Sequence, residues 1–210
     1  MNPQEFVRHL GEVRASAILR TSLAGAVEPA MAAAMRGGFR IVEFTLTTPN
    51  VYVHIADFAA REGLVVGAGT VLTPDEARRA VAAGARFLVS PVVDAAVIAT
   101  AVELGVAMMP GCHTPTEMLA AHRAGAPLQK LFPAPGGGPA YVRACLGPLP
   151  FLNIVPTNGA DETNAREWLR AGAHAIGFVA PLFDATAMAA GRFDEIEARA
   201  RTLLDAVARA

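Results

Sequence analysis

The sequence is poor in several residue types, and lysine is the scarcest of the charged ones. Of its 18 basic residues only Lys130 is a lysine, and all the others are arginines. Its two cysteines, Cys112 and Cys145, are too few for a disulfide framework and lack the spacing of a metal site. We therefore expect neither disulfides nor a bound metal, and no motif in the chain indicates a cofactor.

Long apolar runs and a large net charge are also absent. No run approaches the roughly 20 apolar residues that a membrane-spanning helix needs, and Asp94 and Glu103 interrupt the best candidate. The segment from Met1 to Arg14 is polar and lacks the apolar core of a signal peptide. The net charge of −1 provides no bulk attraction to nucleic acid or to an anionic membrane. We expect a cytoplasmic protein whose partner is a small molecule.

The chain is instead rich in short apolar runs, each preceded by an amphipathic stretch and a glycine. The glycines are Gly11, Gly38, Gly63, Gly84, Gly105, Gly125, Gly147 and Gly172. The runs are Ser16–Leu19, Ile41–Leu46, Leu64–Val66, Phe87–Val89, Val106–Met109, Leu128–Phe132, Phe151–Val155 and Ala175–Phe178. Glycine past a helix end supplies the left-handed conformation that stops the helix, and a continuous apolar run is typical of a strand buried on both faces. Helix starts are expected at the capping residues Thr73 and Thr114 and at Asp161.

Eight strand-and-helix units, spaced about 20 to 27 residues apart, predict a (β/α)₈ TIM barrel. The pattern covers residues 1–210 as a single domain. Residues 1–10 predict an extra N-terminal helix that covers the bottom of the barrel, and residues 193–210 predict a last amphipathic helix. A doubly wound open sheet is the alternative, but it usually carries a glycine-rich fingerprint after its first strand, which this chain lacks.

Lys130 lies within the apolar run Leu128–Phe132, where a short buried strand is predicted. Desolvation lowers the pKa of a lysine, whereas an arginine keeps its proton in proteins. A neutral amine attacks carbonyl carbons, and the protonated imine that forms withdraws electrons from the adjacent carbon. The alternative is a strand-end lysine whose amine reaches water. We favour the first interpretation because the chain uses arginine at every other basic position.

Polar residues near strand ends mark the expected active site, because barrel sites lie where strands end and helices begin. These residues are Arg20, Glu43, Thr70, Ser90, Gly111, Lys130, Thr157 and Gly177. Glu43 interrupts the apolar run Ile41–Leu46, and a buried unpaired carboxylate is costly. We interpret Glu43 as a general acid or base with a raised pKa, and an ion pair with Arg20 or Arg40 is the alternative. Lysine and glutamate without a metal motif favour Schiff-base chemistry that makes or breaks a carbon–carbon bond beside a carbonyl.

Five stretches carry a family resemblance, with matching order and spacing over nearly the whole chain. They are Ala17–Arg20, Val42–Leu46, Val66–Leu72, Pro110–Thr114 and Lys130–Ala134. The sequence resembles the 2-keto-3-deoxy-phosphogluconate / 4-hydroxy-2-oxoglutarate aldolases, which are class I, pyruvate-dependent aldolases. The most specific combination joins Gly67-Ala68-Gly69-Thr70 to the Lys-x-Phe-Pro sequence that begins at Lys130.

The resemblance implies a homotrimer of barrels in which Lys130 forms the imine, Glu43 moves protons and Thr70 helps to hold the pyruvyl group. The other expected substrate-binding residues are Arg20, Gly111, Phe132, Thr157, Asn158, Gly159 and Gly177. The expected substrate is a 2-keto-3-deoxy sugar acid or a 4-hydroxy-2-keto acid, cleaved to or formed from pyruvate and an aldehyde. No cofactor is implied.

Two departures from the family pattern concern how an anionic substrate is held. Many members carry an arginine near Thr47–Pro49, and the chain has none there. The branch that resembles phosphogalactonate aldolases lacks that arginine too and ends its first strand with one, as Arg20 does here. Arg20 is therefore the candidate for a carboxylate or phosphate, with a structural role beside Glu43 as the alternative.

The second departure lies after the seventh and eighth strands, where family members have glycines that cradle phosphate. This chain has Asn158 and the stretch Phe178–Pro181 at these places. Their larger side chains hinder the approach of a phosphate to the backbone, and proline has no amide hydrogen to donate. We therefore expect a non-phosphorylated keto acid to be used at least as well as a 6-phosphorylated one. The alternative is a different phosphate grip made by Gly136–Gly138 and Arg20.

Two other functions stay open at this point. One is a non-catalytic barrel that binds a ligand or serves as a scaffold, and the other is a phosphosugar isomerase or synthase barrel. The second needs a phosphate loop that we expect the chain to have lost, and the single lysine at the imine position favours the aldolase over both.

Overall fold

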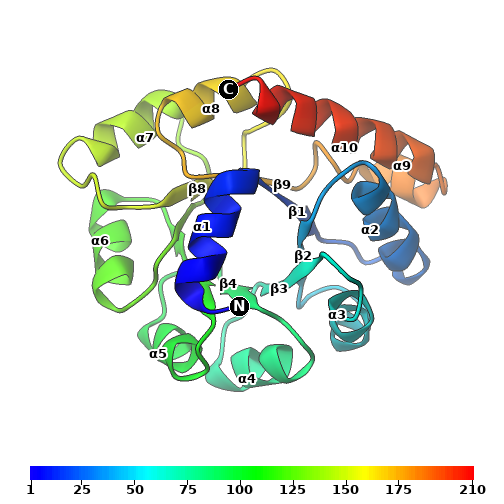
Figure 1. The fold of residues 1–210 in the computed structure, drawn as a ribbon, viewed down its shortest axis with the longest axis horizontal. Helices are drawn as coiled ribbons and strands as arrows, with labels where there is room; N and C mark the ends of the chain where they lie inside the picture. The colour runs from blue at the N-terminus through cyan, green and yellow to red at the C-terminus, as the bar shows by residue number, and fades with distance from the viewer.

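The computed structural model describes residues 1–210 as parallel strands that alternate with helices (Figure 1). The strands are β1 (Ala15–Leu19), β2 (Ile41–Thr45), β3 (Val65–Gly69), β4 (Phe87–Val89), β5 (Ala107–Met109), β6 (Gly111–Cys112), β7 (Gln129–Leu131), β8 (Ile154–Pro156) and β9 (Ile176–Phe178). The helices are α1 (Pro3–Val13), η1 (Ala24–Ala26), α2 (Val27–Arg36), α3 (Val51–Ala59), α4 (Pro74–Ala82), α5 (Ala95–Glu103), α6 (Pro115–Arg123), α7 (Pro139–Leu146), α8 (Ala165–Arg170), α9 (Ala185–Ala189) and α10 (Phe193–Ala208).

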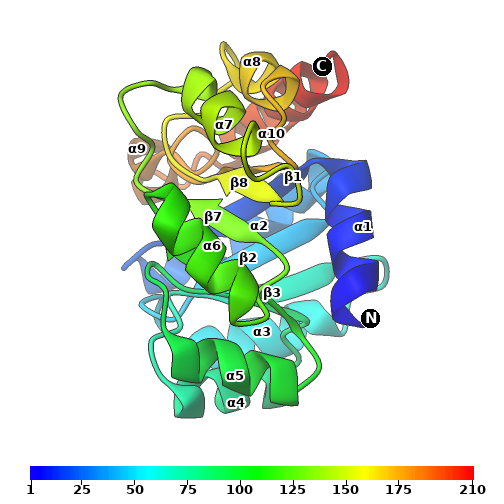
Figure 2. The same ribbon diagram turned by 90° about the vertical axis from the view of Figure 1, so that its left-hand side faces the viewer.

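The strands form two parallel sheets. Six strands follow the order β5-β4-β3-β2-β1-β9, and three follow the order β6-β7-β8. Strand β1 pairs with β2 on one side and with the last strand, β9, on the other, so the two ends of the chain's strand series lie side by side (Figure 1). Figure 2 shows β1, β2 and β3 next to one another in this curled sheet. The predicted α/β class with consecutive parallel strands is confirmed. The alternative of a doubly wound sheet is not confirmed. The strand order of such a sheet reverses part-way across, whereas the order here follows the chain.

The eight predicted strands become nine, and the ladder is interrupted at two places. Pro110 separates β5 from β6, because proline has no amide hydrogen to give to a ladder. Strands β8 and β9 share no ladder, although the His174 N–H donates to Ile154 O at 2.8 Å. The predicted strand Phe151–Val155 also begins too early, because Leu152 still closes a turn with Leu149. What the structure contains is thus a curled six-stranded sheet beside a three-stranded one.

The helix ends follow their local chemistry. Thr73 and Thr114 accept from the third backbone N–H of α4 and α6, as predicted, and each belongs to a capping box. The start predicted at Asp161 is wrong, because its side chain accepts from Thr163 in a turn that delays α8. The stop predicted at Gly11 is wrong as well.

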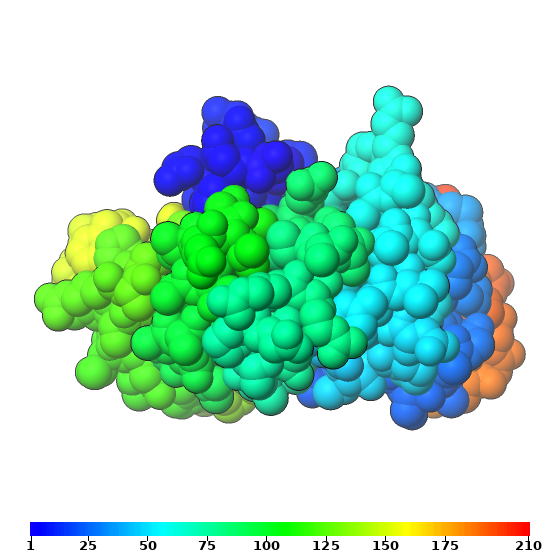
Figure 3. Space-filling view, turned by 90° about the horizontal axis from the view of Figure 1, so that it is seen from below, coloured from blue at the N-terminus to red at the C-terminus, as the bar shows by residue number.

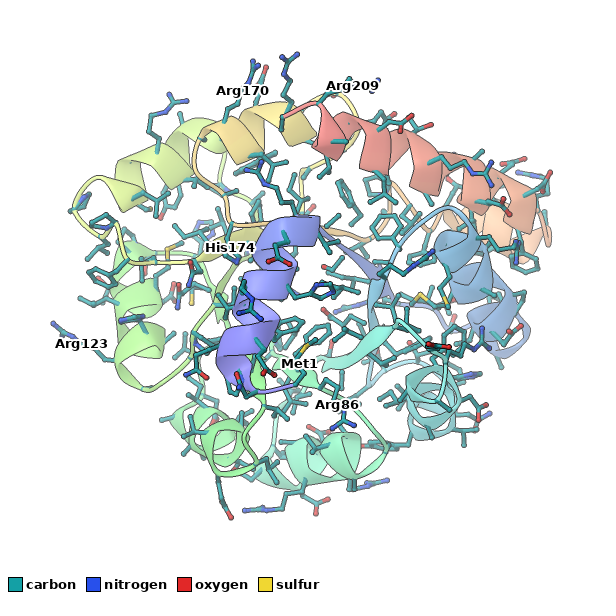
Figure 4. All side chains as sticks on the ribbon, in the orientation of Figure 1. Met1, Arg86, Arg123, Arg170, His174 and Arg209 are labelled. Carbon is teal, nitrogen blue, oxygen red and sulfur yellow. The ribbon has the colours of Figure 1, made fainter.

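Helix α1 runs past Gly11 to Val13, and Arg14 takes the left-handed conformation that ends it, with φ 61°. Gly11 is needed for packing, since a Cβ there would lie 2.8 Å from the His174 ring. The same ring donates from Nε2 to Val7 O at 2.9 Å, and His174 lies beside α1 in Figure 4.

Helix α1 covers the end of the sheets where the strands begin, as predicted, and stands out at one side of the molecule (Figure 3). Phe6 and Leu10 join an apolar cluster with residues at strand starts such as Ile41 and Val65. The Phe6 ring stacks on Phe87 with centroids 4.5 Å apart. This packing closes the amino-terminal end of the strands, so the opposite end is left for a site.

A larger apolar cluster fills the space between the strands and the surrounding helices. The predicted C-terminal helix is α10, which packs beside α2. Arginines such as Arg123, Arg170 and Arg209 lie at the outer edge (Figure 4). None of the helices combines the length and the apolar character that crossing a bilayer requires.

Candidate active site

A cavity of about 240 Å³ lies at the carboxyl-terminal ends of β1, β7, β8 and β9. Seven of the predicted site residues line it, namely Arg20, Lys130, Phe132, Thr157, Asn158, Gly159 and Gly177. They meet because parallel strands place their carboxyl ends at one edge, and the curled sheet brings β9 beside β1. The prediction from polar residues at strand ends therefore identified most of the predicted residues that line the cavity.

Three predicted residues do not line this cavity. Glu43 is buried inside the curled sheet, and Thr70 reaches the site only through its contact with Arg20. Gly111 lies opposite Lys130 in the ladder between β6 and β7. A Cβ at Gly111 would overlap the Pro91 carbonyl, so this glycine makes room for backbone.

Lys130 and Glu43 are both buried, with 7% and 1% of their surfaces exposed. Burial lowers the pKa of Lys130 and raises the pKa of Glu43, and the attraction between the two charges opposes both shifts without cancelling them. Neither carboxyl oxygen of Glu43 has a hydrogen-bond partner. Both groups are therefore biased towards their neutral forms, a free amine and a carboxylic acid.

Two glycines of β3 provide the space that Glu43 and its surroundings occupy. A Cβ at Gly69 would overlap Glu43 Oε1, and a Cβ at Gly67 would overlap the Phe87 ring. The Gly-Ala-Gly sequence of this strand therefore has a steric reason, since any larger residue would displace the buried carboxyl group or the ring below it.

Arg20 is exposed at the cavity mouth, where its Nη2–H donates to Thr70 Oγ1 at 3.1 Å. No ion pair joins Arg20 to Glu43, so the structural alternative for this arginine loses support. Thr70 has φ 61°, a conformation that is strained for a β-branched residue and typical of functional sites.

Comparison with known proteins identifies the family. The family model described as KDPG and KHG aldolase matches residues 8–199. The chain belongs to this family. A relative from Rhizobium meliloti (strain 1021), described as a probable 2-dehydro-3-deoxy-6-phosphogalactonate aldolase, is 37% identical over 170 residues, which are 80% of each chain. Aldolases are lyases, so the protein is a lyase, and the two rival functions left open by the sequence lose support.

Solved structures of related aldolases have the same fold. One described as native KDPGal has a TM-score of 0.85 at 28% identity and covers 93% of this chain and 94% of its own. A KDPG aldolase from Legionella pneumophila has a TM-score of 0.82 at 25% identity, with 92% and 97% covered. That protein holds pyruvate as a covalent carbinolamine intermediate.

Phe178 does not narrow the aldolase cavity, contrary to the sequence interpretation. Its ring is fully buried between strands and helices and meets Phe39 edge-on at 6.1 Å. Alternation along β9 turns this side chain outward while its neighbour Gly177 faces the cavity. Val179 and Pro181 do line the cavity, as expected.

Sequence reasoning missed the residues that support the lysine strand. Gln129 is fully buried, its Oε1 accepts from Asn153 N–H at 3.0 Å, and its Nε2 donates to Ala126 O at 3.0 Å. Asn153 Nδ2 in turn donates to Pro127 O at 3.0 Å. A glutamine beside the catalytic candidate in a buried strand was the only available signal, and Asn153, one of its two partners, is 24 residues away in the sequence.

The raised pKa of Glu43 makes a prediction about stability. A carboxyl group that binds its proton more tightly in the folded state contributes full stability below its ordinary pKa of 4.5. That contribution is lost as the pH rises towards the folded-state pKa. We expect Glu43→Gln, which cannot ionise, to be more stable than the wild type at pH 7, with a smaller difference near pH 4.

Urea unfolding at the two pH values measures this difference, and Glu162→Gln, an exposed change, serves as the control. A wild type that is the more stable protein at pH 7 would show that attraction to Lys130 outweighs desolvation of the carboxylate.

Proposed function

We propose that the protein is a class I aldolase in which Lys130 forms a Schiff base and Glu43 carries protons. The substrate is a 2-keto-3-deoxy sugar acid or a 4-hydroxy-2-keto acid, and the products of cleavage are pyruvate and an aldehyde. The observation that carries the proposal is the chain's only lysine, buried at a cavity with its pKa lowered and with an unpaired carboxyl group nearby. The iminium ion acts as the electron sink, so no cofactor is needed.

Cleavage begins with the neutral amine of Lys130, which attacks the keto carbon, C2, to form a carbinolamine. The Glu43 carboxylic acid gives its proton to the departing hydroxyl, so that water is lost, the iminium ion forms and Glu43 is left as a carboxylate. The C3–C4 bond then breaks, its electron pair moves towards the iminium nitrogen, and the proton of the C4 hydroxyl passes to Glu43, directly or through a water. The aldehyde leaves, and an enamine remains on Lys130.

The enamine is returned to pyruvate by the same two residues. Glu43 gives a proton to C3, which becomes the methyl group of pyruvate, and water hydrolyses the iminium ion to release the amine. A carboxyl group whose pKa is raised by burial suits both steps, because it keeps its proton to a higher pH than an exposed carboxyl group does and can still release it. Arg20 and Thr70, joined by a hydrogen bond, are proposed to hold anionic oxygens of the substrate.

The far wall of the cavity is suited to an anion. Several backbone N–H groups there donate to no protein acceptor, namely those of Asn158, Gly159, Ala160, Val179 and Ala180. Unpaired amides after the last two strands of such a fold are a common phosphate site. Because Phe178 also faces away, we propose that the cavity accepts a phosphorylated substrate, in place of the sequence-based expectation.

Three finer features stay proposals. The two sheets are proposed to complete a (β/α)₈ barrel, which is supported by the continuity of β5 and β6 through Pro110 and by the bond between His174 and Ile154. Assembly as a homotrimer and a cytoplasmic location stay predictions.

The first prediction concerns the imine. Borohydride added with pyruvate should attach a single three-carbon unit to the protein, and peptide mapping should place it on Lys130. The assignment is unusually clean because the chain has no second lysine. Lys130→Ala is the control and should take up nothing; an unmodified wild-type mass under conditions that label a known class I aldolase would refute the proposed function.

The second prediction concerns Glu43. Exchange of the pyruvate methyl protons with solvent deuterium should require this residue. Because general acid–base groups are typically worth about 10² to 10⁴ in rate, Glu43→Gln should slow exchange by that factor while still forming the imine. Proton NMR of pyruvate measures the rate, and exchange at the wild-type rate would assign Glu43 a purely structural role.

The third prediction concerns substrate charge. Charge-assisted hydrogen bonds are worth roughly 1.5–3 kcal/mol each, so two or more amides should favour the phosphorylated acid by at least about a hundredfold in kcat/KM. Matched substrates with and without the 6-phosphate supply the comparison. A ratio near one would instead support the expectation drawn from Asn158, Val179 and Pro181.

A further inference from the structure

His113 lies where the chain leaves the lysine strand. The ladder between β6 and β7 pairs Gly111 with Lys130, and its last backbone bond runs from Phe132 N–H to Cys112 O at 3.0 Å. The next residue, Pro133, has no amide hydrogen with which to continue. His113 Nδ1 lies 2.9 Å from Pro133 O, and since a carbonyl only accepts, Nδ1 carries the proton. A side chain thus extends the ladder past its end.

His113 is itself held from two helices. Its N–H donates to Glu117 Oε2 at 2.8 Å in the first turn of α6. The Tyr141 hydroxyl, from α7, donates to the His113 carbonyl at 2.6 Å, and the two rings stack with centroids 6.4 Å apart. These contacts fix the imidazole independently of the cavity, so it can act as an anchor for Pro133.

Of the two residues between Lys130 and Pro133, Phe132 is the one that faces the cavity. Its ring lines the cavity and lies 5.1 Å from Lys130 Nζ. The loop that follows gives little support, because a Cβ added at Gly136 or Gly138 would meet no atom within 4 Å. The bond from His113 is therefore the only hydrogen bond that holds the chain just after Phe132, beside the packing of Ala134 against the larger apolar cluster.

We propose that His113 is a positioning residue for the lysine site, which holds Phe132 over Lys130 and so shields the amine from water. The inference rests on the proposed function. It explains a histidine that the sequence analysis did not assign to the site. The charged groups that face Lys130 are Glu43 on β2 and Arg20 after β1, and the change described next alters neither.

The test is the rate at which cyanoborohydride traps the pyruvate adduct, followed by intact mass across a range of pH. At pH 7 we expect His113→Ala to be trapped about five- to tenfold more slowly, the effect of one lost hydrogen bond. The deficit should close at higher pH, because an amine opened to water keeps its proton to a higher pH. His113→Asn should recover to within about twofold of the wild type, since its amide can donate from the position of Nδ1.

His122→Ala is the matched control, because it removes an exposed histidine of α6 whose ring lies tilted against that of Phe151, away from this contact. It should match the wild type. Wild-type trapping by His113→Ala would overturn the proposal, and so would a deficit that is equal at every pH and not restored by Asn. Should His113→Ala not fold, Tyr141→Phe replaces it and removes only the hydroxyl bond; a two- to fivefold deficit with the same pH dependence supports the proposal, and an unchanged rate overturns it.

The outcome separates the two proposals. A wild type that traps no pyruvate refutes the aldolase mechanism and the role of His113 with it. A wild type that traps pyruvate alongside unaffected variants refutes the role of His113 alone.

Discussion

The site depends on keeping water away from two ionisable side chains of opposite charge. For Lys130 and Glu43, burial has a larger effect on the pKa than the attraction between them has. That balance is the usual one for buried pairs, whose desolvation often exceeds the Coulombic gain. In this enzyme family the balance is useful, because the amine attacks a ketone only when it is neutral and the acid transfers a proton only when it holds one.

A continuous column of packed side chains maintains this dry interior from the closed end of the strands upward. Phe6 of the N-terminal helix stacks on Phe87, and the Phe87 ring fills the space left by Gly67. Gly67 is the ladder partner of Glu43, whose carboxyl group lies against Gly69. The first helix is therefore connected to the Glu43 carboxyl group, the proposed proton carrier, through three layers of contact, and the two glycines of β3 are the positions where larger residues would break this column.

The sequence predicted the parts of the site that have a local signature. Lys130 and Glu43 were predicted because each is a charged residue inside an apolar run. Most of the predicted residues that line the cavity were identified because they lie at the ends of parallel strands. The sequence did not predict the features that depend on tertiary contacts. The residues that hydrogen-bond to Gln129 and to His113 include partners up to 28 positions away in the sequence. Phe178 was misjudged because the side of the strand it faces depends on register, which a three-residue run does not reveal.

Chemistry and recognition are held by different parts of this fold. The two proposed catalytic residues lie on β2 and β7, where strand pairing and buried side chains fix them. The amides proposed to bind an anion lie beyond β8 and β9, on segments whose sequence can vary without moving the strands. Under the proposed function, we expect substitutions such as Asn158 and Pro181 to alter how the aldehyde portion is held and to leave the imine chemistry intact. Departures from a family pattern at these loops consequently say more about which aldehyde is used than about whether the carbon–carbon bond is cleaved.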